Sequence, residues 1–205
     1  MPYSSVRKVA DADFPTRWGH FRILGFEGVA ERKGVSLTRV DSAVALTMGD
    51  LTVAPPIVRI HSQCLTGDVF HSLRCDCHDQ LHLALGMIAA EGAGILLYEQ
   101  QEGRGIGLMA KLRAYELQDK GRDTIEANLE LGFRVDYREF ELPGEILKAL
   151  HIPAVRLITN NPEKVAAMEA AGIRVVERVS AAIPSEPTFE RYLETKRDKM
   201  GHLEG

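Results

Sequence analysis

Cysteine is the residue type whose placement in this chain most directly suggests chemistry. The three cysteines, Cys64, Cys75 and Cys77, have the spacing C-x10-C-x-C. Thiolates are soft ligands that zinc prefers, and three protein ligands with one open position are typical of a catalytic zinc site. Arg74, beside Cys75, would help to keep the thiols ionised. The spacing therefore predicts one zinc ion per chain.

Two other interpretations of the cysteines stay open on spacing alone. A C-x-C pair is less specific than paired C-x-x-C motifs, so the thiols could be buried without holding a metal. Alternatively, His61, His71 or His78 could complete a closed site with four protein ligands. Such a closed site would be structural rather than catalytic.

The composition excludes several classes of protein. The chain has 205 residues, of which 45% are hydrophobic and 26% charged, and its net charge is −4. These values are typical of a globular protein, and the length predicts a single domain over residues 1–205. Cationic and acidic residues alternate along the chain, so nucleic acid is not an expected partner. The sequence shows neither a signal peptide nor the ~20 apolar residues of a membrane span, which predicts a cytoplasmic protein without membrane contact.

The elements that must position the cysteines change character along the chain. Four runs rich in β-branched residues predict an antiparallel meander of strands, at residues 21–29, 35–40, 43–49 and 55–62. Cys64 follows the last of these strands. Helical periodicity then begins at Asp79, and Gly92 is placed to end the helix.

The second half of the sequence alternates between strands and helices. Buried strands are predicted at residues 94–100, 155–160 and 174–179, and a helix at residues 106–120. Asp123 and Glu126 have the spacing of a capping box. Asn161 is placed to cap a further helix, which starts at Pro162 and ends at Gly172. We therefore expect a mixed α/β fold, in which an N-terminal antiparallel meander is followed by alternating helices and strands. An exposed connection near residues 180–188 and a C-terminal helical tail complete it.

Five long strings carry a family resemblance. In order, they are RIHSQCLTGD (59–68), SLRCDC (72–77), QQEGRGIGLMAKLRAYELQDKGRDTIEAN (100–128), LGFRVDYREF (131–140) and RLITNNPEKV (156–165). Together they closely resemble GTP cyclohydrolase II, the first committed enzyme of riboflavin biosynthesis. The resemblance extends over nearly the whole chain, so we expect the fold of that family here.

The resemblance implies a reaction and a set of binding residues. GTP, with Mg²⁺ on its triphosphate, would yield formate, pyrophosphate and 2,5-diamino-6-ribosylamino-4(3H)-pyrimidinone 5′-phosphate, after zinc-activated water attacks C8 of guanine. The three cysteines match the zinc ligands of the family, and a homodimer is implied. The positions that match GTP-binding residues are Arg59, Ile60, His61, Ser62, Gln63, Gln80, Glu102, Gly103, Arg104, Thr124, Thr159 and Lys164.

The resemblance also implies three catalytic residues. Tyr115 matches a tyrosine that assists the opening of the guanine ring. Asp136 and Arg138 match a base and a nucleophile that attacks the α-phosphate, which would release pyrophosphate and leave a guanylyl enzyme. Because a guanidinium has a pKa above ~12, it is normally a phosphate clamp. Electrostatic stabilisation of the developing charge is therefore the alternative role of Arg138.

Two positions depart from the pattern of the family. Gln63 stands where the family often has glutamate, and His78 follows the last ligand where glycine is usual. These departures keep two alternatives open. One is a paralogue that makes a different product from GTP, and the other is a nucleotide-binding module with a structural zinc that His78 helps to hold.

Overall fold

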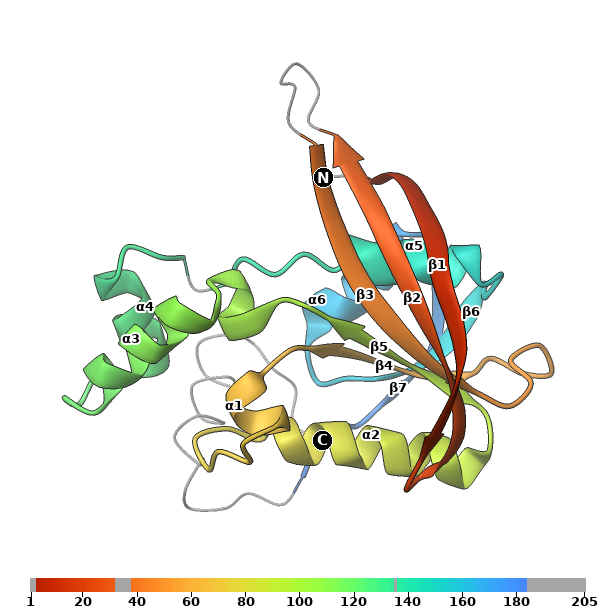
Figure 1. Ribbon diagram of the computed structural model, residues 1–205, viewed down its shortest axis with the longest axis horizontal. Helices are drawn as coiled ribbons and strands as arrows, with labels where there is room; N and C mark the ends of the chain where they lie inside the picture. The colour runs from red at the N-terminus through yellow and green to blue at the C-terminus, as the bar shows by residue number, and fades with distance from the viewer. Residues whose placement is uncertain (1–2, 32–37, 135, 184–205) are drawn as a thin grey trace.

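The computed structural model of the chain describes residues 3–31, 38–134 and 136–183. The described residues form a mixed seven-stranded sheet with the strand order β1-β2-β3-β5-β4-β6-β7. The strands are β1 (Tyr3–Thr16), β2 (Gly19–Glu31), β3 (Thr38–Met48), β4 (Ile57–Ser62), β5 (Gly94–Glu99), β6 (Ala154–Ile158) and β7 (Arg174–Val179). The helices are α1 (Leu65–Asp68), α2 (Cys77–Glu91), α3 (Leu108–Gln118), α4 (Thr124–Glu130), α5 (Glu141–Ala149) and α6 (Pro162–Ala170), with a short 3-10 helix η1 (Glu102–Gly105). The mixed α/β fold is confirmed (Figure 1).

The N-terminal strands form the expected antiparallel ribbon. β1 pairs with β2, and β2 pairs with β3. The prediction missed β1, since most of its side chains are exposed and it therefore lacks the alternation of apolar and polar residues that marks a half-buried strand. The strand predicted at residues 35–40 falls partly outside the described residues. Its described part is continuous with the next predicted strand, as β3.

The meander prediction was wrong for its fourth strand, β4. β5 lies between β3 and β4, and β4 pairs in parallel with both β5 and β6. Five of the six residues of β4 are buried, which is typical of a central parallel strand covered on both faces. The chain returns from β4 to β5 through α1 and α2, because parallel neighbours need a crossover connection. The carboxyl ends of β4, β5 and β6 consequently lie at the same edge of the sheet.

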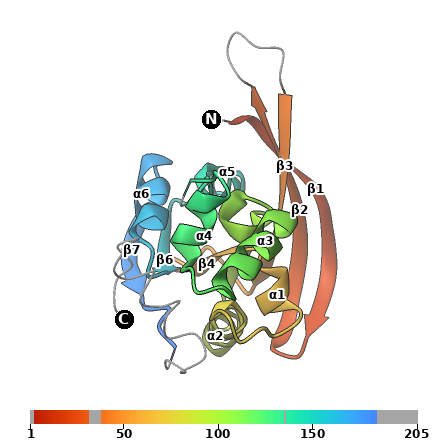
Figure 2. The ribbon, with the colours of Figure 1, turned by 90° about the vertical axis from the view of Figure 1, so that its left-hand side faces the viewer.

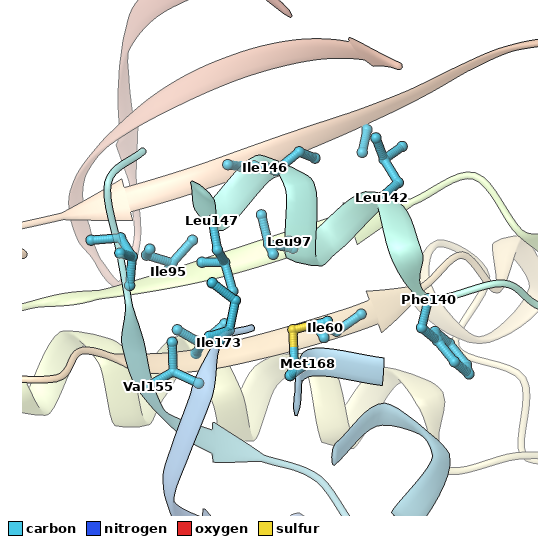
Figure 3. Packing of buried hydrophobic residues seen from close by; sticks show 14 of the residues in the cluster. Ile60, Ile95, Leu97, Phe140, Leu142, Ile146, Leu147, Val155, Met168 and Ile173 are labelled. Atoms are coloured by element: carbon cyan, nitrogen blue, oxygen red, sulfur yellow. The ribbon is translucent and has the colours of Figure 1, made fainter. Parts of the chain in front are cut away.

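Helices cover both faces of the sheet (Figures 1 and 2). On one face, Leu97 of β5 belongs to a core cluster with Leu147 of α5 and Met168 of α6 (Figure 3). On the other face, Leu96 packs in a second cluster with Ile88 of α2. Neighbouring residues of β5 thus point to opposite faces, as the pleat of a strand requires. α3 and α4 lie past the carboxyl ends of β4 and β5 (Figure 1).

Most predicted helix ends agree with the structure. The capping box of Asp123 and Glu126 is present, and Asn161 caps α6 ahead of its first residue, a proline. α2 begins at Cys77 rather than at Asp79, and the helix predicted at residues 106–120 is shorter, as α3. The predicted connection is described only as far as residue 183, and the tail lies outside the described residues. Among the helices in the described ranges, none has the length and apolar content needed to cross a membrane.

Candidate functional site

A large cavity opens at the carboxyl ends of the parallel strands. Its open space is about 1110 Å³, a volume that includes solvent at its mouth. The walls are built by the ends of β4 and β6, the first turn of α2, η1, α3 and α4. This edge of an α/β sheet is where ligands commonly bind, because the loops that follow the strands converge there.

The three cysteines meet in one wall of this cavity. Their sulfur atoms all lie within 4.8 Å of one another, and Cys64 Sγ is 3.7 Å from Cys75 Sγ. None of them forms a disulfide bond. Cys64 directly precedes α1 and Cys77 is the first residue of α2, so two helix starts bring these thiols together. Three convergent thiols are a donor set that fits a soft metal ion such as zinc. We call Cys64, Cys75 and Cys77 the thiol group.

Among the described residues, no histidine belongs to the thiol group. His61 Nε2 lies 3.0 Å from Asp68 Oδ1, and the His61 ring stacks on Tyr98 with centroids 5.5 Å apart. The His78 ring packs against the His71 ring in a tilted arrangement, with ring centroids 3.8 Å apart. A histidine would have to leave these partners to become a fourth ligand. The geometry therefore does not support a closed site with three cysteines and one histidine.

A partly buried lysine adds positive charge to the thiol group. Lys111 Nζ donates to Cys64 Sγ at 3.1 Å and to Glu102 Oε1 at 2.8 Å. The pKa of Cys64 lies well below its ordinary value, because the Cys75 and Cys77 thiols donate hydrogen bonds to its sulfur and Lys111 adds its charge. The same hydrogen bond to Cys64 raises the pKa of Cys75 to about 11. These contacts favour the thiolate form of Cys64, which is the form that binds a metal ion.

Tyr115 lies close to the thiol group. Its hydroxyl is 3.1 Å from Thr66 Oγ1, which in turn lies 3.6 Å from Cys64 Sγ. Burial raises the pKa of Tyr115, so its hydroxyl carries a proton at neutral pH. The Arg74 guanidinium lies 4.7 Å from the centroid of the Tyr115 ring and packs over it. The tyrosine therefore presents a proton donor in the same wall of the cavity as the thiols.

Asp136 and Arg138 form a two-point ion pair. Arg138 Nε donates to Asp136 Oδ1 at 3.0 Å, and Arg138 Nη2 donates to Asp136 Oδ2. Burial tends to raise the pKa of Asp136, but the hydrogen bonds and charge of Arg138 outweigh it and hold this pKa below its ordinary value. The pair is therefore ionised at neutral pH. Arg138 is among the residues that line the cavity and Asp136 is not, and the two-point pairing lets the carboxylate orient the guanidinium.

Two buried cations line the cavity beside the strand ends. Lys164 is 5% exposed, and its Nζ donates to the carbonyl oxygen of Ile60 at 2.8 Å. Arg59 is also 5% exposed and donates to the carbonyl oxygen of Ile158 at 3.0 Å and to Gln80 Oε1. Burial lowers the pKa of Arg59 to about 10, which still leaves it charged at neutral pH. These side chains make the wall suitable for an anionic ligand.

Nearly all the residues that the family resemblance singled out for GTP line this cavity. They are Arg59, His61, Ser62, Gln63, Gln80, Glu102, Gly103, Arg104, Thr124, Thr159 and Lys164. The Ile60 side chain instead lies in the hydrophobic core, because alternate residues of β4 face opposite sides of the sheet. Only backbone atoms of Ile60 could therefore meet a ligand.

The sequence reasoning missed Lys111 and Gln101, which also line the cavity. For Lys111 a signal was available. It precedes Tyr115 by four residues on a predicted helix, and residues at that spacing share one face. Gln101 had no such signal, because its contact with the backbone of Glu139 joins residues 38 positions apart along the chain.

The fold and the cavity define an α/β protein in which three thiols that could hold a metal ion adjoin a pocket lined by buried cations. The sequence model that describes GTP cyclohydrolase II matches residues 7–180. A GTP cyclohydrolase-2 of Enterobacter sp. (strain 638) is 52% identical over 199 residues, which cover 97% of each chain. That of Proteus mirabilis (strain HI4320) is 51% identical over 199 residues, covering 97% of this chain and 96% of the relative. The chain belongs to the GTP cyclohydrolase II family and is an enzyme of that family.

A solved structure with a similar arrangement is that of a two-domain 3,4-dihydroxy-2-butanone 4-phosphate synthase from A. baumannii. Its sequence is 16% identical and the TM-score is 0.45. The match covers 88% of this chain and 41% of that one, so this chain spans less than half the length of the two-domain protein.

Proposed function

We propose that this protein hydrolyses GTP in a zinc-dependent reaction that opens the imidazole ring of guanine, as the first step of riboflavin biosynthesis. The products would be formate, pyrophosphate and 2,5-diamino-6-ribosylamino-4(3H)-pyrimidinone 5′-phosphate. The observation that carries the proposal is that the thiol group and Arg138 line the same cavity. A reaction at both the base and the triphosphate needs a metal site and a cationic site together. Family membership supports the same substrate.

The base of GTP would lie toward the thiol group. Cys64, Cys75 and Cys77 would hold the zinc ion, which when bound supplies Lewis acidity at this part of the cavity. The Tyr115 hydroxyl carries a proton and is held by Thr66. It would donate a hydrogen bond to the guanine ring as the ring opens. Lys111 would keep Cys64 in the thiolate form that the metal requires.

The triphosphate would lie toward the cationic side chains, with Mg²⁺ neutralising part of its charge. Arg138 would stabilise the negative charge that develops as the α-phosphate reacts. The ion pair favours this role over a covalent one. To become a nucleophile, Arg138 must lose a proton to Asp136, whose lowered pKa makes it a weak base. Lys164 and Arg59 would add to the same positive field.

Two further features of the proposal follow from the family resemblance and the thiol chemistry. The resemblance implies a homodimer. Three cysteines that must stay reduced to bind a metal suit the cytoplasm, where thiols are kept reduced. Gel filtration of the purified protein with light scattering would test the dimer.

Incubation of zinc-loaded protein with GTP and Mg²⁺ tests the proposed reaction directly. We expect formate and pyrophosphate in equal amounts, and a nucleotide product with the mass of the ring-opened monophosphate. Arg138→Ala should slow pyrophosphate release by at least ~100-fold, because it removes a preorganised charge from the transition state. Arg122→Ala is the matched control, since this side chain is 54% exposed and pairs with Glu130.

The outcomes separate the alternatives. Pyrophosphate without formate would indicate a paralogue that stops before ring opening, and a different product mass would indicate another pathway. Absence of both products from zinc-loaded protein would refute the proposal and favour a nucleotide-binding module. Unimpaired release from Arg138→Ala would remove Arg138 from the mechanism.

A further inference from the structure

Gln101 connects two segments that are distant in the sequence. Its Nε2 donates to the carbonyl oxygen of Glu139 at 2.7 Å, and its Oε1 accepts from the backbone N–H of Glu139 at 2.8 Å. The side-chain amide thus pairs with both polar groups of one peptide backbone, as a neighbouring strand would. Glu139 directly follows Arg138, so this contact holds the segment that carries the ion pair with Asp136.

Glu99 holds the amide of Gln101 in this orientation. Gln101 Nε2 donates its second hydrogen bond to Glu99 Oε1 at 2.9 Å. Glu99 is the last residue of β5 and is 2% exposed, and its backbone oxygen accepts from Gln63 and Gln101. It is therefore part of the rigid sheet. With both amide hydrogens committed to acceptors, the Gln101 side chain has one favourable orientation.

We infer that Gln101 is a positioning residue for Arg138, acting through the backbone of Glu139 and anchored by Glu99. The inference rests on the proposed function for its catalytic consequence, but not for its geometry. Another backbone contact of the segment is a hydrogen bond from the Tyr137 N–H to the Arg104 carbonyl oxygen at 3.0 Å. Both backbone contacts come from the segment after β5, and the Glu139 side chain also pairs with Arg39 of β3.

The chemistry of the contact is specific to glutamine. Alanine would remove all three hydrogen bonds. Glutamate has nearly the same shape but only acceptor oxygens, so it would repel both the Glu139 carbonyl and Glu99. A displacement of a catalytic group by about 1 Å can slow a reaction by about 100-fold, because the reacting atoms are no longer aligned. Binding of GTP would change less, since most lining residues are untouched.

Hydrogen exchange tests the geometry independently of activity. In Gln101→Ala, exchange at the Glu139 amide should be at least ~5-fold faster than in the wild type, because its acceptor is lost. Gln100→Glu is the matched control, since Gln100 is adjacent but exposed and should leave this exchange unchanged. Unchanged exchange in Gln101→Ala would overturn the inference. So would a loss of protection throughout the chain, which would indicate a general structural role.

Kinetics then test the catalytic consequence. In Gln101→Ala, kcat for pyrophosphate release should fall ~10- to 100-fold while KM for GTP changes less than ~3-fold. Gln101→Glu should recover relative to the wild type as the pH falls, because a protonated carboxyl can again donate to Glu139. Wild-type kcat in Gln101→Ala would refute the catalytic role. A wild-type protein that does not turn over GTP would refute the proposed function instead, and the exchange measurement would still decide the positioning of the segment.

Discussion

The packing around Gly67 allows a sharp test of the thiol group. Gly67 is a buried residue of α1. A Cβ atom added there would lie 3.0 Å from Cys75 Sγ, 3.0 Å from Cys77 Cβ and 3.2 Å from Cys64 Sγ. Ordinary contacts of this kind begin at 3.4 Å. In Gly67→Ala the nearest neighbours must therefore retreat by about 0.4 Å from their 3.0 Å positions.

This displacement is large for a metal site. Ligand distances in zinc sites vary by about 0.2 Å, and changes that misorient the ligands typically weaken binding by about 10- to 100-fold. We therefore expect the zinc affinity of Gly67→Ala to fall by about 1.4–2.8 kcal/mol. In the metal-free protein, replacing glycine by alanine stabilises the folded state by about 0.4–1 kcal/mol, because it lowers the conformational entropy of the unfolded chain. Overpacking costs about 1–3 kcal/mol, so a modest net loss of stability should remain.

Competition with a chromophoric chelator would measure the zinc affinity, and thermal unfolding the stability. Gly86→Ala is the matched control, because Gly86 lies within α2 and an added Cβ would meet no atom within 4 Å. That variant should keep its zinc affinity and gain stability. Wild-type affinity in Gly67→Ala would show that the thiols do not converge around Gly67 in solution. A wild-type protein that binds no zinc would refute the metal site itself.

Two further predictions concern pH and metal removal. Burial raises the pKa of Glu99 from 4.5 to about 7. The negative charge of Glu141 adds to this rise, while the positive charges of Lys164 and Arg138 oppose it. The folded state then binds this proton more tightly than the unfolded state, so stability falls as the pH rises from about 4.5 to about 7, by about 3 kcal/mol. Glu99→Gln keeps a hydrogen-bond acceptor for Gln101. It should raise the free energy of unfolding in urea much more at pH 8 than at pH 5. An equal increase at the two pH values would contradict the raised pKa of Glu99. Separately, a chelator should lower the Tm of the zinc-loaded wild type but not the Tm of Cys75→Ser. A ligand present at about 100 times its Kd stabilises the folded state by about 2.7 kcal/mol, and the chelator would remove this contribution. An unchanged Tm of the wild type would argue against a bound metal.

Local signals in the sequence predicted many features correctly. The capping box at Asp123 and the start of α6 after Asn161 depend on residues within one helical turn of each other. The proximity of the three thiols is also confirmed. Cys75 and Cys77 are close in sequence, and Cys64 needs only the crossover after β4 to reach them. Their roles, and those of the GTP-binding residues, stay predictions that the experiments above address.

Other features depended on contacts between distant segments. The apolar pattern of β4 predicted a strand. The sequence of a buried strand does not indicate which strands pair with it, so the position of β4 between β5 and β6 was missed. The direction in which Ile60 points depends on which face of β4 meets the core.

The sequence alone determined the residue types, the helix caps and the family, because these depend on neighbouring residues or on long strings of them. Only the tertiary structure decided that Gln101 holds Glu139 and that His78 packs against His71 instead of joining the thiols. It also decided that Arg138 shares a cavity with Cys64. The physical reason is that hydrogen bonds and side-chain contacts act over a few ångströms in space, while residues that meet this closely can be far apart along the chain.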